Sequence, residues 1–144
     1  MNIIIGSDHG GFELKEICRE FMETRSDCHV RDAGTFSEDS MDYPRVAHKV
    51  ARAVSESEYE RGILICGTGI GMSVVANRYT GVRACLCHNL FTARLSREHN
   101  DANILVMGGR VIGRGIAIEM VDLFLSTPFE GGRHELRLNL IETD

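Results

Sequence analysis

Short apolar runs alternate with longer segments of helical periodicity along the 144-residue chain. The runs predict buried strands, around residues 3–5, 30, 63–66, 82–87 and 104–107. Apolar residues spaced three or four positions apart predict amphipathic helices, around residues 14–21, 46–54, 72–78, 91–97 and 116–124. A strand followed by a helix, repeated five times, requires a parallel sheet with right-handed crossovers and helices on both faces. The sequence therefore predicts an α/β fold, a three-layer α/β/α Rossmann-like domain with a five-stranded parallel sheet.

Composition narrows the function classes. The chain length suits a single domain, residues 1–144. The formal net charge of −5, without long runs of either sign, disfavours nucleic acid or an anionic membrane as a partner. The first residues lack the basic and apolar regions of a signal peptide, so a cytoplasmic location is expected. The five cysteines do not form the pattern of a small secreted domain and are expected to be reduced.

The segment ILICGTGIGMS, residues 63–73, has a cysteine at the end of a predicted strand and three glycines on alternate positions after it. It lacks the G-K-[ST] ending of a P-loop and the spacing of the dinucleotide fingerprint, which disfavours a nucleotide site. The loop nevertheless opens a predicted helix, so its backbone N–H groups can face an anion or a developing oxyanion. Cys66 lies at the start of this loop.

Chemistry and packing are both open to Cys66. A thiol phosphatase carries a phosphate-binding arginine six positions after its nucleophile, and this chain has Met72 there, which disfavours that mechanism. A cysteine beside a helix N-terminus forms a thiolate more readily, and a thiolate can serve as a general base or a nucleophile. A buried cysteine at the end of a strand needs no chemical role. Its position alone leaves the two interpretations open.

Polar residues follow several predicted strands. Because the functional groups of such sheets gather at the carboxyl ends of the strands, one cleft is expected to collect residues 7–11, 42–44, 66–71 and 108–110. His9, in a glycine-flanked loop, and His99, which closes a helix before the last strand, are both expected to reach it. The other histidines are expected to be solvated: His29, His48, His88 and His134. Cys85 and Cys87 are expected to be strand residues, since no second ligand pair has the spacing of a zinc site.

The segment after Pro128, FEGGRHELRLNLIETD, contains two glycines before a last predicted helix. Arg133 and Arg137 are spaced i, i+4 and therefore share a helix face, while Leu136 and Leu140 form an adjacent apolar stripe. A terminal helix with an apolar side and a flexible entry commonly docks on another surface. Residues from about 128 to 144 are therefore expected to form a dimerisation arm, whose helix reaches a partner subunit.

Five separated motifs carry a resemblance to a known family: GSDHGGFELK, DYP, ILICGTGIGMSVVANR, LSREHNDANILVMGGRVIG and FEGGRHELR. They resemble, in order and over nearly the whole chain, the type B ribose-5-phosphate isomerases, a family that includes the bacterial galactose-6-phosphate isomerase subunits. The resemblance implies a homodimer with active sites shared between subunits, leaves a tetramer open, and implies neither a metal nor an organic cofactor. The implied reaction interconverts D-ribose 5-phosphate and D-ribulose 5-phosphate through a cis-enediol(ate).

The resemblance also implies roles for individual residues. Cys66 would be the base that moves a proton between two substrate carbons, His99 would assist ring opening, and Thr68 would relay a proton between neighbouring oxygens. Guanidinium groups suit phosphate oxygens, and the arginines below would bind phosphate or help close the site. The implied substrate-binding residues are Asp8, His9, Tyr43, Gly67, Thr68, Gly69, Ile70, Gly71, Asn100, Arg110, Arg133 and Arg137.

Two other interpretations remain open. The substrate could be a 6-phosphohexose, allose 6-phosphate or galactose 6-phosphate, because these sugars differ from ribose 5-phosphate only in chain length and hydroxyl stereochemistry. The chain could also be a non-catalytic sugar-phosphate-binding module, since a fold does not determine a function. The presence of both Cys66 and His99 favours an enzyme, because a binding module needs neither a base nor a ring-opening group.

Overall fold

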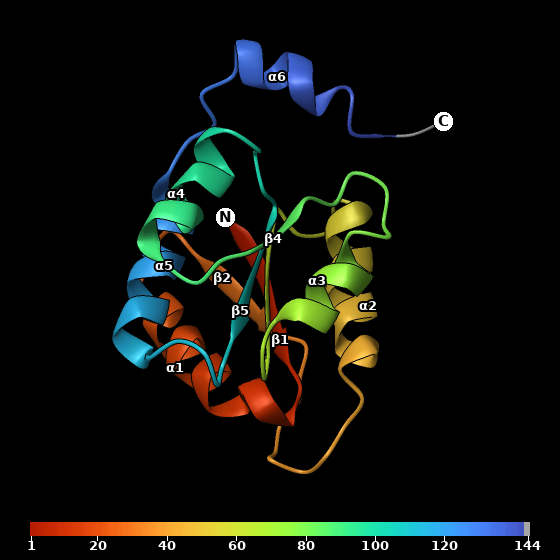
Figure 1. The fold of residues 1–144 in the computed structure, drawn as a ribbon. Helices are drawn as coiled ribbons and strands as arrows, with labels where there is room; N and C mark the ends of the chain where they lie inside the picture. Colours follow the sequence, from red (N-terminus) through yellow and green to blue (C-terminus); the bar gives the residue numbers. More distant parts are fainter. Residues whose placement is uncertain (143–144) are drawn as a thin grey trace.

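The computed structural model describes residues 1–142. Its centre is one five-stranded sheet with the strand order β2-β1-β3-β5-β4 (Figure 1). All four strand pairings are parallel, as the alternating pattern predicts. The strands are β1 (Asn2–Ser7), β2 (His29–Asp32), β3 (Arg61–Cys66), β4 (Ala84–Leu86) and β5 (Ile104–Gly108).

Helices cover both faces of the sheet, which confirms the three-layer arrangement (Figure 1). One face packs against α1 (Phe12–Glu23), α4 (Leu90–Glu98) and α5 (Arg114–Ser126), and the other against α2 (Tyr43–Ser55) and α3 (Ile70–Ala76). Each face has its own apolar core, one around Ile5, Met107 and Phe124 and the other around Leu64 and Val50. No helix in the described part of the chain is long and apolar enough to cross a membrane.

Most elements extend past the residues that predicted them, whereas β4 is shorter than expected and α3 begins and ends earlier. The expected strand 82–87 is only Ala84–Leu86, and before its start the N–H of Val82 is bound to the carbonyl of Tyr79 in a turn and does not join the sheet. The helix α3 begins at Ile70 rather than 72 and ends at Ala76 rather than 78. Gly69 directly before it has φ +81°, a left-handed conformation that glycine adopts without strain. The chain can therefore turn into the helix two residues earlier.

Parallel strands give the sheet two chemically different edges. The carboxyl ends of the strands form the carboxyl edge, where the short helix η1 (His9–Gly11) follows β1 (Figure 1). Their amino ends form the amino edge, where the connection from α4 to β5 turns and where α6 (Arg133–Leu138) stands away from the sandwich (Figure 1). A residue that directly follows a strand therefore lies at the carboxyl edge, and a residue that follows a helix between two strands lies at the amino edge.

The expected terminal helix is present as α6, which confirms an extra helical element after the α/β domain. Its apolar side chains are exposed, Leu136 at 70% and Leu140 just beyond the helix at 83%. This is the surface expected of a segment that docks elsewhere. Thr143 and Asp144, the last two residues of the expected arm, lie outside the described residues.

Candidate active site

Cys66 is the last residue of β3, and its side chain is held by the loop that follows. The residue is only 5% exposed, and its Sγ accepts a hydrogen bond from the N–H of Gly69 at 3.1 Å. A donor aimed at sulfur interacts more strongly with a thiolate than with a neutral thiol. Gly69 is required for this turn, because a Cβ there would lie 2.5 Å from Cδ1 of Leu86. The loop thus points a donor at the sulfur and rigidly positions it.

The loop after β5 is joined to the loop after β3 by two backbone hydrogen bonds. The N–H of Gly109 donates to the carbonyl of Cys66 at 2.7 Å, and that of Arg110 to the carbonyl of Gly67 at 3.0 Å. The Arg110 side chain lies over Gly67, where an added Cβ would be 3.5 Å from Nη1. A positive charge therefore lies beside the Cys66 loop.

Asp8 and His9 reach the same edge from the end of β1. The buried Asp8 caps η1, since its Oδ1 accepts from the N–H of Gly11 at 3.1 Å. His9 Nδ1 accepts from the N–H of Met41 at 3.2 Å, so a neutral ring carries its hydrogen on Nε2. A Cβ on Gly10 would lie 3.2 Å from the N atom of Gly67. The loops after β1 and β3 are therefore in contact, and His9 presents a donor.

A cavity of about 470 Å³ opens beside these loops and is lined by ten residues, among them His9, Glu38, Gly109, Arg110 and Arg114. Cys66 does not line this cavity. The lining residue Gly109, however, donates its N–H to the carbonyl of Cys66, so the cavity lies next to the Cys66 loop. Motif spacing missed Arg114 and Glu38. Arg114 is the first residue of α5, and its position after the loop of the last strand was the available signal.

Tyr43 lies on the other side of the glycine loop. It begins α2, and its ring packs on Gly71, where an added Cβ would be 2.5 Å from Cζ. Two amides of the loop have partners within it: the N–H of Gly69 is bound to the sulfur and that of Ile70 to Oγ1 of Thr68 at 3.3 Å. Any oxyanion-binding role of the loop therefore falls to the amides of Gly67, Thr68 and Gly71.

His99 and Asn100 lie at the opposite edge, which corrects the expectation that His99 reaches the cleft of its own chain. His99 comes before β5, whose first residue Ile104 pairs with Gly62, whereas Cys66 pairs with Gly108 at the other end of β5. The strand from Gly62 to Cys66 alone spans about 13 Å at ~3.3 Å per residue. The reason is topological: α4 runs antiparallel to the strands, so its last turn ends at the amino edge. The exposed Arg133 and Arg137 of α6 lie at that edge too (Figure 1).

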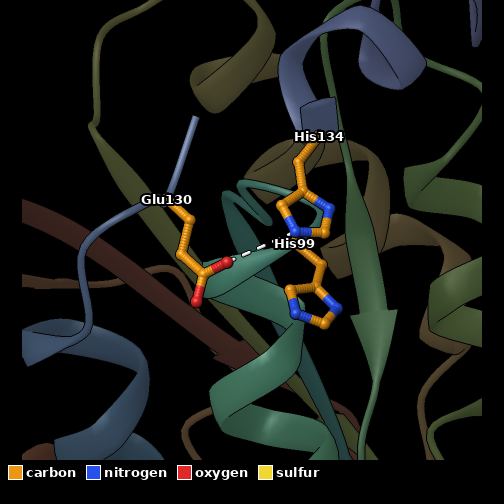
Figure 2. Close-up of side chains that lie close together, drawn as sticks. All are labelled: His99, Glu130 and His134. Carbon is orange, nitrogen blue, oxygen red and sulfur yellow. Dashed lines mark ion pairs between the residues drawn. The ribbon is translucent and has the colours of Figure 1, made fainter. Parts of the chain in front are cut away.

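His134 is not the solvated residue expected from the sequence. It is 6% exposed, and its ring stacks on that of His99 with centroids 4.2 Å apart and an angle of 11° between the planes. Glu130 Oε2 lies 3.3 Å from its Nε2 (Figure 2). Among the described residues these three form the one group of three or more His, Cys, Asp or Glu side chains whose ligand atoms lie within 4.8 Å of one another.

The remaining cysteines are unsuited to acid–base chemistry near neutral pH. Burial raises the pKa of Cys18 to about 12. Burial, and then the neighbouring Cys87, raise the pKa of Cys85 to about 11. The pKa values of Cys28 and Cys87 are also raised, in each case mainly by burial. These thiols therefore stay protonated, in agreement with a packing role.

Comparisons with known proteins identify the family and agree with the fold. The family model described as Ribose/Galactose Isomerase matches residues 3–141. The chain is 46% identical over 140 residues to ribose-5-phosphate isomerase B of Escherichia coli, covering 96% of this chain and 93% of the relative. The ribose-5-phosphate isomerase B structure from Clostridium thermocellum superposes with a TM-score of 0.95 at 50% identity, covering 98% and 95% of the two chains. That of Mycoplasma genitalium, with bound ribulose-5-phosphate, has a TM-score of 0.93 at 43% identity, covering 97% and 93%. The chain therefore belongs to the ribose/galactose isomerase family, which makes it an isomerase of the aldose–ketose class.

Proposed function

We propose that the protein interconverts D-ribose 5-phosphate and D-ribulose 5-phosphate, with Cys66 as the catalytic base. The observation that carries this proposal is the placement of the Cys66 sulfur, which accepts an N–H at the end of β3 in a loop whose Gly67 lies beside the guanidinium of Arg110. Proton abstraction next to a carbonyl needs a positioned base, donors for the developing oxyanion and an anchor for the phosphate. Each of these has a candidate at the carboxyl edge.

The proposed reaction moves protons without an external reactant. The Cys66 thiolate removes the proton on C2 of the open-chain aldose, and the electron pair forms the C1–C2 double bond while negative charge develops on O1. The amides of Gly67, Thr68 and Gly71 stabilise that oxygen. Thr68 relays the O2 proton to O1, and the Cys66 thiol returns its proton to C1. The products are the ketose and the regenerated thiolate.

The proposal includes a homodimer in which each site combines the carboxyl edge of one subunit with the amino edge of the other. This part of the proposal is supported by the distance along the strand direction between Cys66 and His99 of one chain, which is about 13 Å or more when estimated from the strand rise. A pentose phosphate cannot contact both ends of its own sheet. The arm at about 128–144 would then carry Arg133 and Arg137 to the partner's phosphate site, and its exposed leucines would be covered there.

A direct assay tests the reaction. Purified protein is incubated with ribose 5-phosphate, allose 6-phosphate and galactose 6-phosphate in turn, and ketose formation is followed to obtain kcat/KM for each. The highest kcat/KM is expected for ribose 5-phosphate. A clear preference for either hexose would replace the pentose in this proposal, and no conversion of any of the three would favour a binding module.

A further inference from the structure

The cluster of His99, Glu130 and His134 has no role in the reaction as proposed beyond that of His99 itself. Gly131 and Gly132 lie between Glu130 and His134 in the sequence, and their φ values are +68° and +58°. The N–H of Glu130 donates to the carbonyl of Glu98, the last residue of α4, at 3.1 Å. The chain after α5 is thus fastened beside His99, and the two glycines then turn it so that His134 covers the His99 ring (Figure 2).

The residue types resemble a metal-binding set, but the ring geometry argues against one. A metal ion lies in the plane of each imidazole that binds it, along the lone pair of a ring nitrogen. The two rings are stacked with an angle of 11° between their planes and centroids 4.2 Å apart, so their lone pairs run side by side and do not converge. One ring would have to leave the stack before both could bind one ion.

The stack itself constrains His99. His99 is partly exposed while His134 is buried, and χ2 of histidine is a broad torsion with little intrinsic preference. A buried neighbour that lies flat on one face of the ring leaves it fewer orientations. Glu130 Oε2 lies 3.3 Å from His134 Nε2, in an orientation that does not make a hydrogen bond. The flat contact is therefore the main restraint.

We propose that His134 is a positioning residue, which holds the His99 imidazole by stacking in the orientation needed to open the sugar ring. This inference rests on the proposed function, because it assumes that His99 opens the ring. Fixing a reacting group before the substrate arrives removes an entropic cost from the reaction step. His134 needs no proton transfer of its own for this role.

Ring opening can be measured separately from isomerisation. An enzyme that cannot open the furanose uses only the open-chain aldose, so at high enzyme concentration spontaneous opening limits the rate. The rate from ribose 5-phosphate then stops rising with enzyme concentration. In the reverse direction no such limit exists, since O5 of ribulose 5-phosphate carries the phosphate and cannot close a ring on C2. Initial rates in both directions, measured against enzyme concentration in the presence of EDTA, isolate the ring-opening step.

Two substitutions separate stacking from packing. His134→Leu fills the buried space without a flat face, and His134→Phe keeps a flat ring without nitrogen. We expect His134→Leu and His99→Ala to reach a plateau with ribose 5-phosphate, and wild type, His134→Phe and the exposed same-helix control Glu135→Gln to stay linear. All should stay linear with ribulose 5-phosphate. Circular dichroism and the unfolding midpoint verify that the variants are folded.

The possible outcomes distinguish the two proposals. A plateau for the wild-type protein would show that the enzyme does not open the ring, which overturns the role of His99 and with it this inference. A linear response of His134→Leu, together with a plateau for His99→Ala, would overturn the positioning role alone. A plateau for His134→Phe would also overturn it, because a nitrogen of His134 would then be required.

Discussion

At the scale of single residues, Cys66 differs from the other four cysteines in what surrounds its sulfur. The pKa values of those four are raised mainly by burial, whereas Cys66 Sγ accepts a backbone N–H at the mouth of a polar loop. Replacing this proposed base should therefore affect chemistry more than folding. We expect Cys66→Ala to lower kcat by about 10²- to 10⁴-fold, the usual contribution of a positioned base, with KM for ribose 5-phosphate nearly unchanged. Steady-state kinetics with Cys18→Ala as the matched control would test this, and a kcat within a few-fold of wild type would refute the assignment.

The same contrast predicts selective modification of one thiol. At pH 8 Cys18 and Cys85, with pKa values of about 12 and about 11, hold almost no thiolate, and only thiolates react with iodoacetamide. We expect limited alkylation to label Cys66 first, in step with the loss of activity, and substrate to slow both. Peptide mass spectrometry identifies the labelled residue. Inactivation accompanied by labelling at another cysteine would contradict this expectation.

Lys15 is a buried charged residue whose ion pairs are expected to stabilise the fold. Its side chain is fully buried, with Nζ 2.5 Å from Asp32 Oδ2 and 2.8 Å from Glu16 Oε1. Substitution to Met would leave the largely buried Asp32 carboxylate without its main partner, so we expect Lys15→Met to lower the free energy of unfolding by about 3 kcal/mol. In contrast, Glu23→Gln breaks an exposed pair with Arg19 and should cost less than about 1 kcal/mol. Urea unfolding measures both, and equal losses would refute the distinction.

At the scale of elements, the active-site edge depends on how β3 passes into α3. Gly69 makes that turn at φ +81°, and a Cβ there would lie 3.0 Å from the backbone of Met107 as well as 2.5 Å from Leu86. We expect Gly69→Ala to destabilise the protein by about 1–3 kcal/mol and to displace the N–H that Cys66 accepts, so that activity also falls. Gly81→Ala is the matched control, since its φ is +75° but nothing lies within 4 Å of an added Cβ. Equal losses of stability and activity in the two variants would show that backbone strain alone matters.

The sequence predicted the elements better than their limits. Periodicity located every strand and helix of the sandwich, because a buried strand or an amphipathic helix leaves a local apolar pattern. The ends of β4 and α3 were misplaced, since a turn hydrogen bond at Val82 and a left-handed glycine before Ile70 decided them. The buried state of His134 was also missed, because its burial depends on a stack with a residue 35 positions earlier.

At the scale of the whole molecule, a site built from both edges requires two subunits. Cys66→Ala would lack the base, and His99→Ala at high enzyme concentration would be held to the spontaneous opening rate of ribose 5-phosphate. Under these conditions each variant alone should be far slower than wild type, but in a mixed dimer one site would contain both wild-type residues. With random pairing in a two-fold dimer, mixing the variants should restore about a quarter of wild-type activity. Co-refolding of equal amounts, followed by assay and size-exclusion chromatography, measures this. A chain that is active as a monomer, or no recovery from verified mixed dimers, would exclude the shared site.

The sequence by itself determined the α/β class, the parallel sheet and the loops that meet around Cys66, because these follow from local apolar periodicity and from where strands end. It also carried the motifs that led to the family. The same alternation places the end of α4, and with it His99, at the amino edge, because a helix between two parallel strands must run back to where the next strand begins. Only the tertiary structure decided that His134 lies on the His99 ring, because that stack depends on the path of the chain after α5, which no local pattern encodes.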